Sequence, residues 1–78
     1  MSELTKKINR FFKLATRQEV KEIKDKIYIS DHLEQVFTMY YLQGKSIDYI
    51  ADTTGYGITK INSDLKLLRE KINKILWG

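Results

Sequence analysis

Two segments of helical periodicity, separated by glycine, occupy residues 45–72 and constrain the fold more than any other stretch. Ser46 can cap the first segment, because its hydroxyl can accept a hydrogen bond from a first-turn amide. Gly55 follows this segment, where a helix end often requires a positive φ that glycine adopts at little cost. Ala51 lies four residues before Gly55, and Ile61 lies six residues after it. This spacing is typical of a helix-turn-helix, in which a small residue admits the crossing helix and an isoleucine packs beneath it.

The rest of the composition indicates one small all-α domain. The 78 residues include no proline, and the four glycines fall at predicted helix ends. A hydrophobic content of 42% and a charged content of 31% favour a globular fold over disorder. The chain has no cysteine, which excludes disulfides and zinc–thiolate sites and fits a reducing compartment. It also has no long apolar run and no signal-peptide core, so we expect a cytoplasmic protein without membrane association.

Two further amphipathic segments precede the helix-turn-helix. Residues 3–15 carry an apolar stripe, and Thr16 with Glu19 has the spacing of a capping box. Residues 3–27 therefore form either two helices or one long helix with a kink near Thr16. A helix capped by Ser30 or Asp31 should follow and end at Gly44. Its predicted buried face is Leu33, Val36, Phe37, Tyr40 and Tyr41.

The last predicted helix, at residues 58–76, has apolar residues at alternating steps of three and four, as in a heptad seam. The seam consists of Ile58, Ile61, Leu65, Leu68, Ile72 and Ile75. A small core would not cover a helix of this length. The C-terminal part should therefore pack either on the N-terminal helix or on a second subunit, as a homodimer.

Over residues 29–78 the chain resembles region 4 of bacterial sigma factors and the small phage or mobile-element regulators that share its tetrahelical pattern. The residues that carry the resemblance are Tyr41, Gly44, Ser46, Ile50, Ala51, Gly55, Ile61 and Leu65. Two residues depart from the pattern: Gly57, where a capping serine is usual, and Asp64, an acidic residue in the recognition helix.

The resemblance implies a small tetrahelical helix-turn-helix domain at 29–78, preceded by an additional N-terminal helical segment at 1–28, with a long C-terminal recognition helix. It also implies sequence-specific binding of double-stranded DNA in transcription control, and contact with RNA polymerase. The chain has no room for the separate sigma domain that melts promoters, so a stand-alone regulator is expected.

Charge is unevenly distributed along the chain. Residues 1–29 hold eight basic and four acidic residues, a net charge of +4. Residues 30–57 have a net charge of −3, and residues 58–78 a net charge of +3. A basic recognition helix suits a polyanion such as DNA.

The outward positions of the recognition helix are the predicted DNA contacts, because Ile58, Ile61 and Leu65 should point inward. Asn62 could contact adenine, and Lys60 could reach guanine or phosphate. The helix dipole and free amides at the start of the preceding helix also favour a phosphate. The complete predicted set is Lys45, Ser46, Thr59, Lys60, Asn62, Ser63 and Lys66. For Arg69 and Lys71, ion pairing within or between helices is the simpler interpretation.

Other functions receive less support from the residues. Ser30, Asp31 and His32 are adjacent in sequence, but a catalytic triad requires a spatial arrangement that consecutive residues of one turn do not provide. His32 is expected to be a surface histidine. We therefore expect no enzymatic activity, no cofactor and no metal site. Tyr56 is expected to plug the glycine turn. Two alternatives remain. The first is a phage DNA-packaging protein, like a small terminase, or a recombination accessory protein. The second is a protein-interaction module that does not bind DNA, which Asp64 and the acidic middle of the chain would favour.

Overall fold

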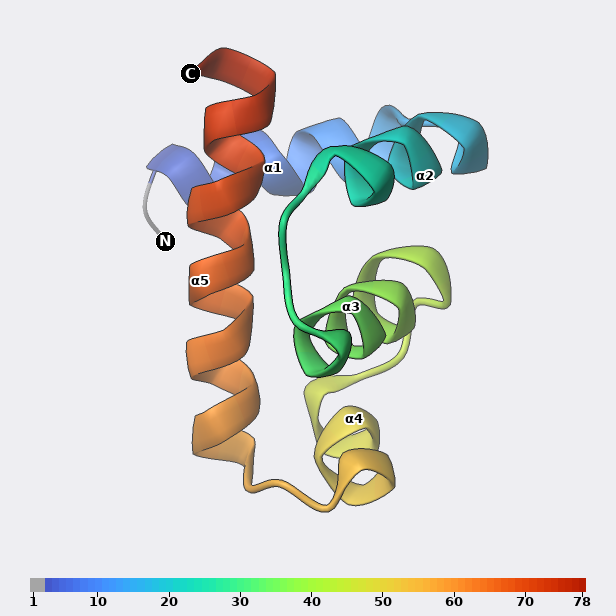
Figure 1. The fold of residues 1–78 in the computed structure, drawn as a ribbon, viewed down its shortest axis with the longest axis vertical. Coiled ribbons are helices and arrows are strands. Elements are labelled where there is room, and N and C mark those ends of the chain that lie inside the picture. The colour runs from blue at the N-terminus through green and yellow to red at the C-terminus, as the bar shows by residue number, and fades with distance from the viewer. Residues whose placement is uncertain (1–2) are drawn as a thin grey trace.

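Residues 3–78 fold into five α-helices and one π-helical turn in the computed structural model of the chain (Figure 1). The elements are α1 (Glu3–Leu14), α2 (Arg17–Lys26), α3 (Asp31–Phe37), η1 (Thr38–Leu42), α4 (Ile47–Thr54) and α5 (Ile58–Trp77). The all-α prediction is confirmed. The longest helix, α5, runs the length of the molecule, and α1 crosses it near its C-terminal end (Figure 1).

The N-terminal segment forms two helices, not one kinked helix. The Thr16 hydroxyl accepts a hydrogen bond from the Glu19 amide at 3.1 Å. The Glu19 carboxylate in return accepts one from the Thr16 amide, also at 3.1 Å. This reciprocal capping box satisfies two amides that a helix start leaves unpaired, so it stabilises a new helix at Arg17.

One side of α5 forms the centre of the hydrophobic core. The four central residues of the predicted seam are at most 1% exposed: Ile61, Leu65, Leu68 and Ile72. Helices α1, α2, α3 and α4 all contact α5, and the buried core includes residues from every one of the α-helices. The centre of the seam is therefore covered by the chain's own helices, and α1 packs on α5 as the first of the two alternatives predicted.

The third helix begins at one of its two predicted caps but ends differently from the expectation. Ser30 caps it, with its hydroxyl accepting a hydrogen bond from the Leu33 amide at 3.3 Å. The helix then widens into the π-turn η1, where the Gln43 amide donates to the Thr38 carbonyl at 3.0 Å. The wider turn changes which side chains face inward, so Met39 is buried although the sequence pattern did not predict it.

An aromatic cluster joins the π-turn to α1. The Tyr41 ring stacks on Phe12 with centroids 4.1 Å apart, and lies 5.1 Å from the buried Phe37 ring. The Tyr41 hydroxyl is buried without a hydrogen-bond partner among the described residues. Burial raises the pKa of Tyr41 to about 12, while the nearby Arg69 guanidinium acts in the opposite direction. Tyr41 is therefore a partly buried residue that packs against the core, on the face that the sequence predicted to be buried.

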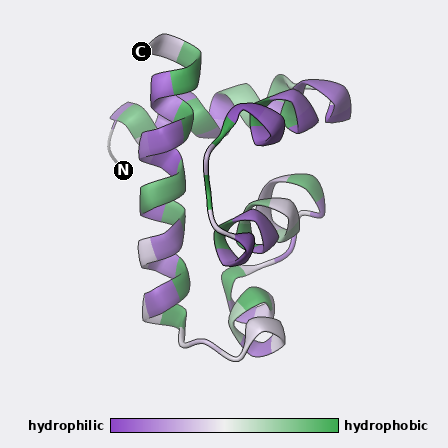
Figure 2. Cartoon of the chain, in the orientation of Figure 1, coloured by the Kyte–Doolittle hydropathy of each residue, from purple (hydrophilic) through white to green (hydrophobic). Residues whose placement is uncertain are grey.

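The outer surface is strongly polar on α2 and more mixed on α5, where hydrophilic and hydrophobic residues alternate around the helix (Figure 2). None of the helices in the described part of the chain is both long and apolar enough to cross a membrane.

Candidate nucleic-acid interface

Helices α4 and α5 are joined by a tight turn at residues 55–57. The Ser46 hydroxyl caps α4 by accepting a hydrogen bond from the Tyr49 amide at 3.1 Å. At the other end, Gly55 adopts φ +79°, and its amide donates to the Ala51 carbonyl. Gly57 then occupies the N-cap position of α5 in an extended conformation without a side-chain cap. The chain therefore reverses at the glycines, as the spacing predicted, and the missing serine does not prevent α5 from starting at Ile58.

The crossing of the two helices is closely packed. Ala51 is 6% exposed on α4, and Ile61 is fully buried on α5. A small residue and a buried isoleucine at these positions let the helices contact each other directly. Both packing roles predicted from the sequence are confirmed.

Four of the predicted contact residues share one face of α5. Thr59, Asn62, Ser63 and Lys66 are all exposed and follow the i, i+3, i+4, i+7 spacing of a single helical stripe. This stripe lies opposite the buried seam, in the N-terminal half of the helix. We call these four residues the polar stripe.

The remaining predicted residues lie outside the polar stripe. Lys45 and Ser46 are exposed at the start of α4, where the Lys45 ammonium lies 4.9 Å from the centroid of the Tyr49 ring. Lys60 is half-exposed on the flank of α5, and its ammonium donates a hydrogen bond to the Asp64 carboxylate at 2.9 Å. Lys60 therefore differs from the residues of the polar stripe, because its ammonium is already paired with a carboxylate of the same chain.

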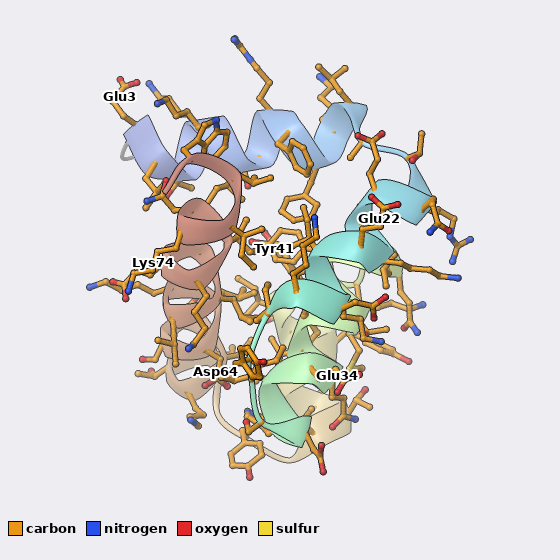
Figure 3. The ribbon with its side chains drawn as sticks, turned by 45° about the horizontal axis from the view of Figure 1, so that its top comes forward. Glu3, Glu22, Glu34, Tyr41, Asp64 and Lys74 are labelled. Atoms are coloured by element: carbon orange, nitrogen blue, oxygen red, sulfur yellow. The ribbon has the colours of Figure 1, made fainter. Side chains whose placement is uncertain are left out.

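Asp64 is buried within the molecule, with 3% of its surface exposed. Its second carboxylate oxygen accepts a hydrogen bond of 2.6 Å from Nε2 of His32 on α3. Figure 3 shows the Asp64 side chain lying between α5 and α3. Two donors thus satisfy the carboxylate, as burial of a charge requires. Asp64 neither faces solvent nor forms part of a protein-contacting surface, so it no longer supports the protein-interaction alternative.

Two expectations about neighbouring residues were wrong. His32 is not a free surface histidine, because it is bonded to Asp64 and partly covered by the Tyr56 ring, with centroids 4.5 Å apart. Tyr56 does not plug the turn: it remains 47% exposed and packs on His32.

Ile58 was expected to point inward and does not. It is 50% exposed, although its place in the seam matches that of the buried residues further along α5. Ile58 is the first residue of the helix and lies at the edge of the core, so its neighbours cover only half of it. The result is an apolar side chain exposed next to the polar stripe, which periodicity alone did not reveal.

Comparisons with protein-family models, with curated proteins and with solved structures found no significant match. Within residues 3–78, no three histidine, cysteine, aspartate or glutamate side chains are grouped to hold a metal ion.

The glycine turn leads to a prediction with a matched control. Gly55→Ser should lower the free energy of unfolding by about 1–2 kcal/mol, because the left-handed conformation is strained for any residue with a Cβ. A Cβ would meet no atom within 4 Å at either Gly55 or Gly57, so steric contact does not distinguish the two sites. Gly57→Ser should be neutral or stabilise by a few tenths of a kcal/mol, because serine suits an N-cap. Urea denaturation measures both, and equal effects would contradict this account.

The buried carboxylate leads to a second prediction. His32→Ala should lower the free energy of unfolding by about 2–3 kcal/mol, because Asp64 loses one of its two donors while remaining buried. Lys60→Ala should cost less than about 1 kcal/mol, since its ammonium is half-exposed and solvent can replace it. Thermal or urea unfolding provides the comparison. In an Asp64→Asn background the cost of His32→Ala should shrink; an unchanged cost would show that the histidine acts through packing alone.

Proposed function

We propose that this protein is a sequence-specific DNA-binding regulator of transcription, similar to sigma factor region 4, with α5 as its recognition helix. The observation that carries the proposal is the polar stripe, four exposed hydrogen-bonding or basic side chains in the N-terminal half of the second helix of a helix-turn-helix. In helix-turn-helix proteins this part of the second helix contacts base edges in the major groove. Asn62 is suited to adenine, and Thr59 and Ser63 to phosphates or either base edge.

The start of α4 supports anchoring to the DNA backbone. The Ser46 oxygen accepts a hydrogen bond from the Tyr49 amide, which leaves its own hydrogen free to donate to a phosphate. Lys45 adjoins it, and the positive end of the α4 dipole favours an anion. Internal pairing of Asp64 also removes an exposed carboxylate that phosphates would repel.

We extend the proposal to contact with RNA polymerase, on the resemblance alone. A homodimer through the C-terminal part of α5 remains the other proposal from the sequence: Ile72 there is buried by the chain's own helices, whereas Trp77 is 49% exposed.

The proposal predicts selective and salt-dependent DNA binding. The purified protein should enrich a defined motif from random duplexes, and its affinity should fall steeply with salt. Asn62→Ala should cost about 1–3 kcal/mol of binding free energy and relax the preference at one base pair, whereas Lys66→Ala should reduce the salt slope by about one. Lys74→Ala is the matched control, an exposed lysine near the opposite end of the same helix. Absence of any enriched motif would overturn the proposal.

The exposed Ile58 leads to a further prediction about specificity. An apolar side chain at the start of the recognition helix can contact the methyl group of thymine. Replacing thymines of the selected motif one at a time with deoxyuridine should weaken binding at one position by about 0.8 kcal/mol, the value of one buried methyl. Ile58→Ala should abolish that difference, and Leu67→Ala, which removes another exposed apolar side chain of α5, should retain it. A motif bound equally well with thymine or uracil throughout would exclude the methyl contact while leaving DNA binding intact.

A further inference from the structure

An open apolar groove lies where α1 meets the C-terminal end of α5, at the other end of the molecule from the α4–α5 turn (Figure 1). Its volume is about 370 Å³. The apolar part of its lining consists of Phe11, Leu14 and Ala15 from the N-terminal segment and Trp77 from α5.

Two apolar side chains of the groove face solvent. Leu14 is 77% exposed and Trp77 is 49% exposed. Exposing such groups is unfavourable by about 25 cal/mol per Å² of apolar surface. Single exposed leucines are common on protein surfaces, but here an exposed leucine and tryptophan lie in the same hollow. The shared hollow gives the apolar side chains of a partner a place to pack against both residues.

The rim of the groove is basic. Lys7 and Arg10 line it, and the Lys7 ammonium lies 5.6 Å from the centroid of the Trp77 ring. The acidic residue in the lining is Glu19, whose carboxylate accepts the hydrogen bond of the α2 capping box. Two basic residues and one acidic residue therefore line the groove, so a ligand with carboxylates beside an apolar face would meet a net charge of +1 together with apolar surface.

We propose that this groove binds an amphipathic helix of another protein, with an apolar face and acidic flanks. The apolar face would cover Leu14 and Trp77, as in other helix-in-groove complexes. Its carboxylates would pair with Lys7 and Arg10, which gives the preference for an acidic partner. The proposal does not depend on DNA binding, because the polar stripe lies at the opposite end of α5.

Charge argues against a second copy of this chain as the occupant. In a two-fold symmetric contact whose axis passes through the groove, Lys7 and Arg10 of one copy would lie near the same residues of the other. The whole chain also has a net charge of +4, which adds repulsion between copies.

A displayed library of random 16-residue peptides, selected on the immobilised full chain, tests the proposal. Enriched peptides should carry leucine or phenylalanine at i, i+3, i+4 and i+7 with aspartate or glutamate beside them. Because Trp77 is the single tryptophan of the chain, its emission should shift to shorter wavelength when an enriched synthetic peptide covers it. No enrichment, or enrichment without acidic residues, would overturn the proposal.

Variants locate the binding surface. Leu14→Glu should weaken binding of the enriched peptide by about tenfold or more, as expected for a central apolar contact, and because Leu14 is exposed the variant should keep its circular dichroism spectrum. Leu67→Glu is the control on a different surface of α5 and should leave binding unchanged. The double variant Lys7→Glu/Arg10→Glu should bind a version of the peptide with lysine in place of its acids.

Two further measurements address the other occupants. Vesicles with and without phosphatidylglycerol should leave Trp77 emission unchanged, and sedimentation equilibrium should show that the free chain does not associate through Leu14. A vesicle-induced shift without peptide binding would assign the groove to a membrane surface. Self-association lost in Leu14→Glu would assign it to a second copy, and either result would overturn the proposal.

Discussion

The buried side of α5 is the interaction on which the rest of the structure depends. Four other α-helices contact this one helix, and its central apolar residues are at most 1% exposed. Without cysteines or a metal cluster in the described chain, a domain of 78 residues relies on such packing for its stability. Because α5 must stay in register with all its neighbours, the opposite side of the helix has a fixed orientation. That fixed side carries the polar stripe.

The buried Asp64 adds directional information that apolar packing lacks. Its carboxylate lies between His32 on α3 and Lys60 one turn earlier on α5, with bonds of 2.6 Å and 2.9 Å. A hydrogen bond requires a defined distance and angle, whereas leucine side chains tolerate sliding. A buried ionic group contributes little net stability when compared with a well-packed apolar one. Its value here is that it fixes how far α5 can slide or rotate against α3, and with it the presentation of the polar stripe.

Local chemistry explains how much of this structure the sequence could predict. The Thr16–Glu19 capping box, the Ser46 cap and the left-handed Gly55 depend on residues within one helical turn, so their patterns are visible in the chain. The His32–Asp64 bond joins residues 32 positions apart, and no periodicity connects them. Ile58 follows the seam pattern but lies at the edge of the core. Its exposure depends on where neighbouring helices end, which a pattern within α5 cannot report.

The polar stripe and the apolar groove lie at opposite ends of α5 and differ in chemistry, because the exposed residues of α5 change along its length. Near the turn the helix presents short polar side chains and a lysine, which suit a hydrated, charged groove. Near its C-terminus it contributes Trp77 to an apolar groove with a basic rim. The twenty residues of α5 span about 30 Å, so the two surfaces are far enough apart to bind two different partners. Because α5 is packed along the length between them, a duplex at one end and a protein helix at the other would be held in a fixed relative orientation, which is the geometry that a regulator needs to position a partner on DNA.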